Sequence, residues 1–97
     1  MILVDPIRDW PSGQWCHMGT DDLTPAGLEE LHAMAAHIGM QRRWFQGKDP
    51  RHPHYDLRPS KRALAVRAGA VEVGATEFVR RVTRDPRPDE EVRDANG

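Results

Sequence analysis

The chain has one cysteine, no long hydrophobic run and no glycine-rich phosphate loop. The single cysteine, Cys16, excludes an intrachain disulfide and fits the reducing conditions of the cytoplasm. No apolar stretch approaches the roughly 20 residues that cross a bilayer, so we expect no membrane partner. Residues 1–6 lack a basic start and include an acid and a proline, so they do not predict a signal peptide. The missing phosphate loop argues against the usual nucleoside triphosphatases.

What is present suits one small domain. Hydrophobic residues make up 38% of the 97-residue chain and charged residues 30%, as in ordinary globular proteins. We predict a single α/β domain over residues 1–82. Residues 83–97 contain one apolar side chain larger than alanine, so we expect a disordered charged tail there.

The net charge of −1 hides an uneven distribution. Residues 1–40 carry one basic and six acidic side chains, a formal charge of −5, whereas residues 41–67 carry eight basic and two acidic ones, a formal charge of +6. A basic middle is what an anion or nucleic-acid site needs. Alternatively, the two halves fold against each other and partly cancel, and the sequence leaves both readings open.

Three short strands are predicted to alternate with helices. Apolar and β-branched residues favour strands at 2–4, from about 40 to 45, and at 70–73. Residues 6–23 are interrupted by proline and glycine and predict a long loop, while 55–57 is briefly extended. This order predicts a small α/β fold with three short, mainly parallel strands and three helices, βαβαβα.

The helices are predicted from capping residues and apolar spacing. Thr24-Pro25 is a typical helix start, and apolar residues three and four apart extend the helix to a stop at Gly39. A second helix is expected from Pro59 or Ser60 to Gly69. Thr76 is expected to cap the last helix.

Four unusual features are expected to meet at one edge of the sheet. In open parallel sheets, ligands bind beyond the carboxyl ends of the strands. The features that would lie there are Asp5, the loop from Trp10 to His17, the segment from His52 to Asp56, and the helix start Ser60-Lys61-Arg62.

A metal site is one hypothesis for this edge. His52 and His54 are two residues apart, so an extended chain would point both imidazoles to one side. Together with Cys16, His17 or Asp56 they would offer ligands that zinc accepts. The spacing matches no closed zinc signature, because the chain has only one thiol. A divalent metal cofactor is therefore compatible with the sequence but not favoured by it, and we assign no residue as a metal ligand.

The same residues suggest two kinds of catalysis without a metal. A Cys16 thiolate with His17 or His54 as base is not favoured, because adjacent residues rarely face each other and no diagnostic motif is present. General acid–base catalysis needs a histidine beside a carboxylate. The groups that could assemble such a pocket are His17, His32, His54, Asp5 and Asp56.

Anion binding has the best physical support. A helix N-terminus offers unpaired backbone N–H groups and a positive dipole end. Here it coincides with Ser60, Lys61 and Arg62, with Arg58 just before the helix. Nucleic-acid binding is a third hypothesis, because aromatic side chains can stack on bases, although core packing is the favoured explanation for each single aromatic residue. The aromatic residues concerned are Trp10, Trp15, Trp44 and Tyr55.

The arrangement of these residues resembles a family of small bacterial and phage proteins known only as domain of unknown function 4031. The matching residues are Trp15 and His17, Glu30-Leu31-His32-Ala33, His54-Tyr55-Asp56-Leu57, and Gly69-Ala70-Val71 with Val73. The resemblance brings no activity, cofactor or partner with it. It implies a pocket of three histidines and one aspartate. In that pattern serine often stands at Cys16, and the position of His52 has no part in it.

We therefore expect a cytoplasmic domain whose pocket binds an anionic, phosphate-bearing ligand and hydrolyses it with or without a metal. The residues assigned to catalysis are His17, His32, His54 and Asp56. Those assigned to ligand binding are Asp5, Trp15, Tyr55, Ser60, Lys61 and Arg62. The alternative is a non-catalytic adaptor that anchors a host or phage protein through Trp10 and Trp15.

Overall fold

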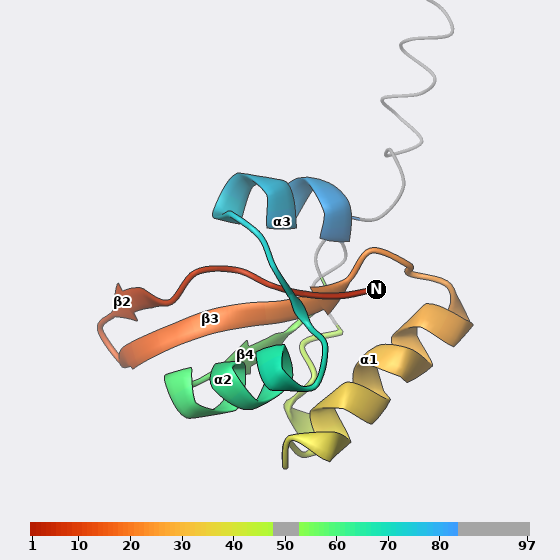
Figure 1. Ribbon diagram of the computed structural model, residues 1–97, viewed down its shortest axis with the longest axis horizontal. Coiled ribbons are helices and arrows are strands. Elements are labelled where there is room, and N and C mark those ends of the chain that lie inside the picture. Colours follow the sequence, from red (N-terminus) through yellow and green to blue (C-terminus); the bar gives the residue numbers. More distant parts are fainter. Residues whose placement is uncertain (48–52, 84–97) are drawn as a thin grey trace, which may run out of the picture.

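The computed structural model describes residues 1–47 and 53–83, and this part of the chain forms a small mixed α/β domain (Figure 1). It contains five strands, three α-helices and one 3-10 helix. The strands are β1 (Ile2–Val4), β2 (Arg8–Trp10), β3 (Gly13–Thr20), β4 (Tyr55–Leu57) and β5 (Val71–Glu72). The helices are α1 (Pro25–His37), α2 (Pro59–Arg67) and α3 (Ala75–Val82), and the 3-10 helix is η1 (Arg42–Trp44).

The sheet is largely antiparallel, so the prediction of mainly parallel strands is wrong. The long strand β3 pairs antiparallel with β1, β2 and β4. Within the described residues only β1 and β5 pair in parallel. The expected site at the ends of parallel strands therefore has no counterpart, and the faces of β3 and β4 become the places to look.

The difference arises in residues 6–23, where the sequence predicts a long loop and the structure has a hairpin. Pro11 and Ser12 form a two-residue turn between Trp10 and Gly13, which are paired in the β2–β3 register. Gly13 has a φ of 123°, a conformation that glycine adopts without steric cost. The proline and glycine therefore make a tight turn between two strands.

Two of the helices begin and end as predicted. The Thr24 side chain accepts a hydrogen bond from the Gly27 N–H at the start of α1, which has proline in its first turn. Helix α2 begins at Pro59. Gly39 and Gly69 follow α1 and α2 with φ values of 87° and 114°, so both glycine stops are confirmed.

Three other local predictions need correction. The strand expected at about 40–45 is replaced by η1, in which the Trp44 and Phe45 N–H groups donate to carbonyls three residues earlier. The strand expected at 70–73 is shortened to β5. Helix α3 begins before Thr76 and has Gly74 at its N-cap, so threonine is not the cap.

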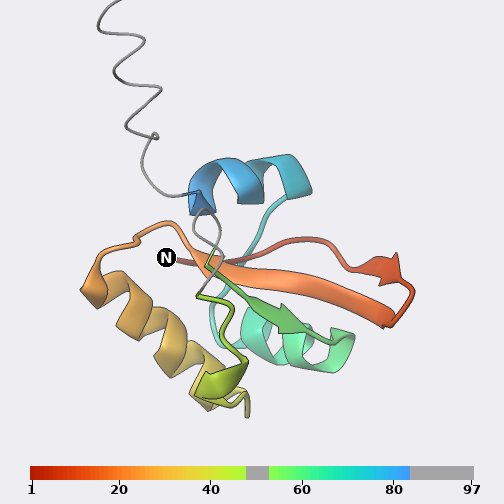
Figure 2. The same ribbon diagram turned by 180° about the vertical axis from the view of Figure 1, so that it is seen from behind.

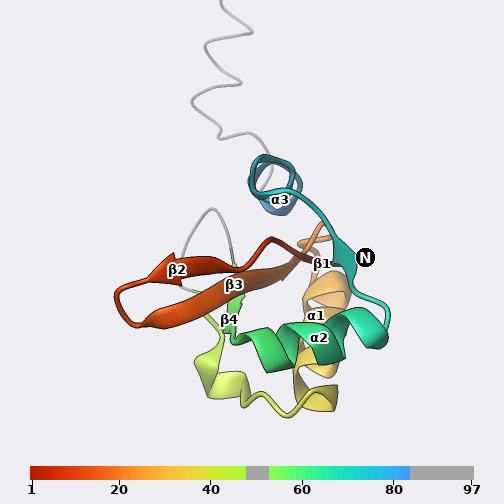
Figure 3. The ribbon, with the colours of Figure 1, turned by 60° about the vertical axis from the view of Figure 1, so that its left-hand side comes forward.

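Helices cover both faces of the sheet (Figures 1 and 3). Helices α1 and α2 pack on one face, where Leu31 and Ala65 join the main core with Cys16, Met18 and Tyr55. Helix α3 lies on the opposite face and forms a smaller core from Leu3, Phe78 and Val82. Successive strand residues point to opposite faces, so the residues between the core positions of β3 and β4 lie on the α3 side.

No helix among the described residues is long and apolar enough to span a membrane. The disordered tail is predicted over residues 83–97, of which 84–97 lie outside the described residues, as does His52. Strand β4 pairs with β3, and the view from behind shows the two strands side by side (Figure 2). This pairing brings the two segments singled out in the sequence together.

Candidate functional site

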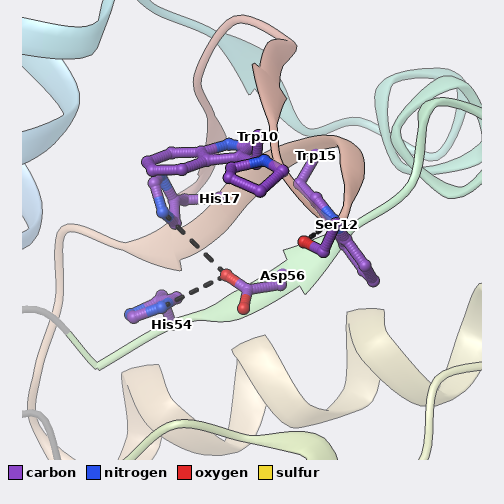
Figure 4. Close-up of a pocket in the computed structure, with 7 residues that line it drawn as sticks. Trp10, Ser12, Trp15, His17, His54 and Asp56 are labelled. Atoms are coloured by element: carbon purple, nitrogen blue, oxygen red, sulfur yellow. Dashed lines mark hydrogen bonds and ion pairs between the residues drawn. The ribbon is translucent and has the colours of Figure 1, made fainter.

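Pairing of β3 with β4 places His17, His54 and Asp56 on one face of the sheet. His17 is the direct partner of Asp56 in the antiparallel register. His54 precedes Asp56 by two residues and so points to the same side. Both imidazoles lie toward the Asp56 carboxylate in Figure 4. Two segments separated by more than 30 residues thus meet. They do so on a face of the sheet and not at the predicted strand-end edge.

The three side chains approach one another through specific atoms. His54 Nε2 lies 3.3 Å from Asp56 Oδ1, and His17 Nε2 lies 3.9 Å from the same oxygen. Each of the three residues offers one potential ligand atom, and these three atoms all lie within 4.8 Å of one another. The hydrogen bond from His54 holds the pKa of Asp56 below its ordinary value, the imidazole charges act in the same direction, and burial opposes them. The carboxylate is therefore ionised at neutral pH.

Asp5 fixes the orientation of His17 from behind. Its carboxylate is 3% exposed and accepts hydrogen bonds from the His17 backbone N–H at 2.6 Å and from His17 Nδ1 at 2.8 Å. A carboxylate can only accept, so the hydrogen of the neutral imidazole sits on Nδ1. The Nε2 lone pair of His17 is then directed toward Asp56. Asp5 acts on the site through His17.

Gln46 holds the second oxygen of Asp56. Its Nε2 donates to Asp56 Oδ2 at 3.0 Å, and its backbone N–H donates to the His54 carbonyl at 2.8 Å. Oδ1 of Asp56 is thereby left facing the two imidazoles. Sequence reasoning missed Gln46, because its role depends on an isolated bridge to His54 that no local pattern announces.

A cavity of about 540 Å³ opens in front of these groups. The β2–β3 hairpin supplies most of its wall, including Trp10, Pro11, Ser12 and Trp15 (Figure 4). Trp15 Nε1 donates to Ser12 Oγ at 3.0 Å, which fixes one indole wall. His17 also stacks on Phe78 of α3 at 5.9 Å between ring centroids. We call this cavity, with His17, His54 and Asp56 at its base, the histidine pocket.

The donor set fits a divalent transition metal. Zinc ligands lie about 2.0–2.2 Å from the ion, so two ligands of a tetrahedral site are about 3.4 Å apart. The distances of 3.3 and 3.9 Å to Asp56 Oδ1 are close to that spacing. Two imidazoles and one carboxylate leave a coordination position open, which is typical of catalytic sites. Among the described residues, this is the one such cluster of histidine, cysteine and carboxylate groups.

His32 and Tyr55 do not join the pocket. They lie on the face covered by α1, where His32 Nδ1 and the Tyr55 hydroxyl are 2.7 Å apart and the tyrosine is fully buried. Burial lowers the pKa of His32, aided by the charge of Arg42, and burial raises the pKa of Tyr55. These two residues form a polar contact within the core, opposite the histidine pocket.

Cys16 also faces the core. It is 1% exposed, and burial together with the negative charge of Asp5 raises the pKa of its thiol to about 12. A thiol with that pKa is protonated at neutral pH and is a poor nucleophile. Burial of Cys16 therefore argues against a thiolate mechanism, which the sequence does not favour either.

The basic residues at the start of α2 are not gathered in the histidine pocket. Lys61 Nζ donates to the Ile38 carbonyl at 2.8 Å. Arg62 donates to the Asp5 carbonyl at 2.8 Å and pairs with Glu72 at 2.9 Å. Ser60 is exposed and is not among the residues that line the pocket. Arg62 therefore supports the backbone behind Asp5, while Lys61 lines a neighbouring groove.

Fold and site together define a small mixed α/β domain with a two-histidine, one-aspartate cluster on its sheet. A family model described as "Protein of unknown function (DUF4031)" matches residues 2–85, and the chain belongs to this family. No curated protein and no solved structure gives a significant match.

Proposed function

We propose that the histidine pocket binds a divalent transition metal ion and, with it, hydrolyses a small phosphate-bearing substrate. The observation that carries this proposal is the convergence of His17 Nε2 and His54 Nε2 on Asp56 Oδ1, at 3.9 and 3.3 Å respectively. His17 Nε2, His54 Nε2 and Asp56 Oδ1 would be the metal ligands. Zinc is the first candidate, because it accepts two imidazoles and a carboxylate with one open position.

The residues around the three ligands support this assignment. Metal-bound histidines commonly donate their second ring N–H to a carboxylate, as His17 does to Asp5 at 2.8 Å. The bond from Gln46 to Asp56 Oδ2 similarly leaves Oδ1 as the ligand atom. His17 is 31% exposed and Asp56 37% exposed, so an ion can reach them from the cavity. Both the ligands and their supports are thus in place.

The chemistry follows from the charges at the base of the pocket. A divalent ion would offset the negative charges of Asp5 and Asp56, and its open coordination position would accept a phosphate oxygen. A bound metal also lowers the pKa of water to about 7. In the hydrolysis, the water oxygen bonds to phosphorus, the ester P–O bond breaks, and the leaving oxygen takes up the proton that the water releases. The indoles of Trp10 and Trp15 would shield this step from bulk water.

Metal binding is the first test. After dialysis against a chelator, titration with Zn²⁺ in a calorimeter is expected to give about one ion per chain. His54→Gln should weaken the affinity at least about tenfold. His37→Gln is the matched control, because His37 is exposed on α1 and distant in sequence from the pocket residues. Failure of zinc, manganese, iron and cobalt to bind, or equal affinity in both variants, would overturn the proposal.

Hydrolysis is tested separately with chromogenic phosphate monoesters and diesters. Turnover should require added metal and should be lost in His54→Gln but kept in His37→Gln. A specific alternative is general acid–base catalysis by His17, because Asp5 also orients that imidazole for proton transfer. Turnover that survives the chelator would favour this alternative and contradict the role of the metal.

A further inference from the structure

A second cavity, of about 640 Å³, adjoins the histidine pocket. The two share Trp15 and Asp56 as common wall residues. The remaining residues of the second cavity come from η1 and its flanks and from the start of α2: Met40, Arg43, Trp44, Phe45, Gln46, Arg58 and Lys61. We call it the basic groove. Both volumes fall in the range of small-molecule sites.

The basic groove collects cations that other parts of the domain leave unpaired. Arg42 pairs with Glu29 at 3.1 Å and Arg62 pairs with Glu72, so part of the basic middle of the chain is neutralised. By contrast, Arg43, Arg58 and Lys61 line the groove, and none of the three forms an ion pair with a carboxylate of residues 1–47 or 53–83. The groove therefore offers three positive charges against the single carboxylate of Asp56, which points to an anionic occupant.

Arg58 lies beside Trp15, a residue of the wall that the two cavities share. Its guanidinium carbon lies 4.0 Å from the centre of the Trp15 ring, a cation–π contact. Lys61 donates one hydrogen to the Ile38 carbonyl, and an ammonium group has three. Both cations thus keep donors for a ligand. Arg58, next to Trp15, is placed where an anion would pass between the groove and the histidine pocket.

The other wall of the groove is aromatic. Trp44, on η1, is 45% exposed, and the partly buried Phe45 follows it. Phe45 packs against His32 and Tyr55, which anchors this wall to the core. An indole that is half open beside fixed cations suits a ligand with a flat ring and a negative charge. A sugar phosphate alone would leave the aromatic wall uncovered.

We infer that the substrate of the histidine pocket is a mononucleotide, and that the basic groove binds its base and sugar. The base stacks on Trp44, and Arg43 and Lys61 provide surrounding positive charge. The phosphate passes Arg58 and Trp15 and ends at His17, His54 and Asp56. This inference rests on the proposed hydrolytic function, whereas the binding of the base by the groove does not need the metal.

The test uses calorimetry with the full chain and three probes: adenosine 5′-monophosphate, ribose 5-phosphate and adenosine. In chelator, the nucleotide should bind at least about tenfold more tightly than ribose 5-phosphate, because only the nucleotide stacks. Adenosine should also bind more weakly, because it lacks the anion. With zinc, the affinity for the nucleotide should rise further, and His54→Gln should remove that increase.

Variants separate the groove from the metal site. With chelator present, Trp44→Leu and Arg58→Gln should each lower the affinity for the nucleotide about tenfold or more. Neither variant should change the affinity for zinc. Arg67→Gln is the matched control, because Arg67 lies at the exposed end of α2. Equal binding of nucleotide and ribose 5-phosphate, or an unchanged Trp44→Leu, would overturn the inference. Preference for a single-stranded oligonucleotide, with affinity falling steeply in salt, would also overturn it. Loss of zinc binding alone would instead reject the proposed function and leave the groove result standing.

Discussion

At the residue scale, one buried carboxylate decides which nitrogen of His17 faces the pocket. Asp5 follows β1 directly and was predicted from the sequence as a ligand-binding residue, but it contacts His17 rather than the cavity. Its two oxygens each accept one hydrogen bond from the same residue. Asp5 is therefore a positioning residue. Removing its negative charge should change the tautomer of His17 while keeping the shape of the pocket.

Asp5→Asn tests this role. The new amide would donate to His17 Nδ1, so the ring hydrogen would move to Nε2, the proposed ligand atom. We expect zinc affinity to fall about 10- to 100-fold, and the free energy of unfolding to fall by about 2 kcal/mol through loss of a charge-assisted hydrogen bond. Competition with a chelating dye measures the first effect and urea denaturation the second. Asp9→Asn, an exposed change on β2, is the control; zinc affinity equal to wild type in Asp5→Asn would contradict the role.

At the scale of elements, the β2–β3 hairpin forms most of the histidine pocket, because its turn supplies Ser12 and its strands supply Trp10, Trp15 and His17. It contributes Trp15 to the basic groove as well. The turn depends on Gly13. A Cβ added there would meet a guanidinium nitrogen of Arg58 at 2.4 Å, and the φ of 123° would strain any larger residue. The hairpin tip is therefore fitted to a residue of the basic groove.

Gly13→Ala should lower the free energy of unfolding by about 1–2 kcal/mol and displace Arg58 from Trp15. Urea denaturation measures the stability, and weakened nucleotide binding would report the displacement. Gly74→Ala is the matched control, because a Cβ there meets nothing within 4 Å, and we expect a change of no more than about 0.5 kcal/mol. Equal stability of the two variants would show that the turn tolerates a side chain.

Local signals explain which elements could be predicted. Helix α1 follows from Thr24, Pro25 and Gly39, since capping and stopping act over a few residues. The hairpin escaped prediction because Pro11-Ser12-Gly13 suits a loop and a tight turn equally, and pairing between distant segments decides between them. The same limit applies to the site: the sequence suggested that His17, His54 and Asp56 belong together, whereas their atomic contacts required the β3–β4 register.

At the scale of the whole molecule, the sheet separates two histidine environments. His17 and His54 face the cavity beside α3, while His32 bonds Tyr55 in the core under α1. The acidic region, residues 1–40, and the basic region, residues 41–67, also meet, as the ion pair of Glu29 with Arg42 shows, so part of the charge asymmetry cancels on folding. Protonation therefore has different consequences on the two sides of the sheet.

The pKa of His32 is lowered by burial, so between its folded value and the ordinary 6.5 the unfolded chain binds a proton that the folded chain does not. Its contribution to stability is complete above pH 6.5 and is lost as the pH falls through the folded pKa. Asp56, whose pKa is also lowered, adds a further loss below about pH 4. Urea denaturation from pH 4.5 to 7.5 should show the first loss.

The control for that first loss is the pair His32→Gln and His37→Gln. Glutamine at position 32 keeps an acceptor for the Tyr55 hydroxyl but does not titrate, so the stability of that variant should depend less on pH as the pH falls below 6.5. His37→Gln should follow the wild-type curve. Identical pH profiles for all three proteins would show that His32 is not the group responsible.

The three tryptophans of the chain have one more consequence. Trp10 and Trp15 line the histidine pocket, and Trp15 and Trp44 line the basic groove, so no indole is located away from a cavity. Tryptophan fluorescence of the native protein therefore originates at the two cavities. A cobalt ion in the histidine pocket, or a ring stacked in the basic groove, would quench this fluorescence. Ligands for both cavities can therefore be screened by the fluorescence of the unlabelled protein.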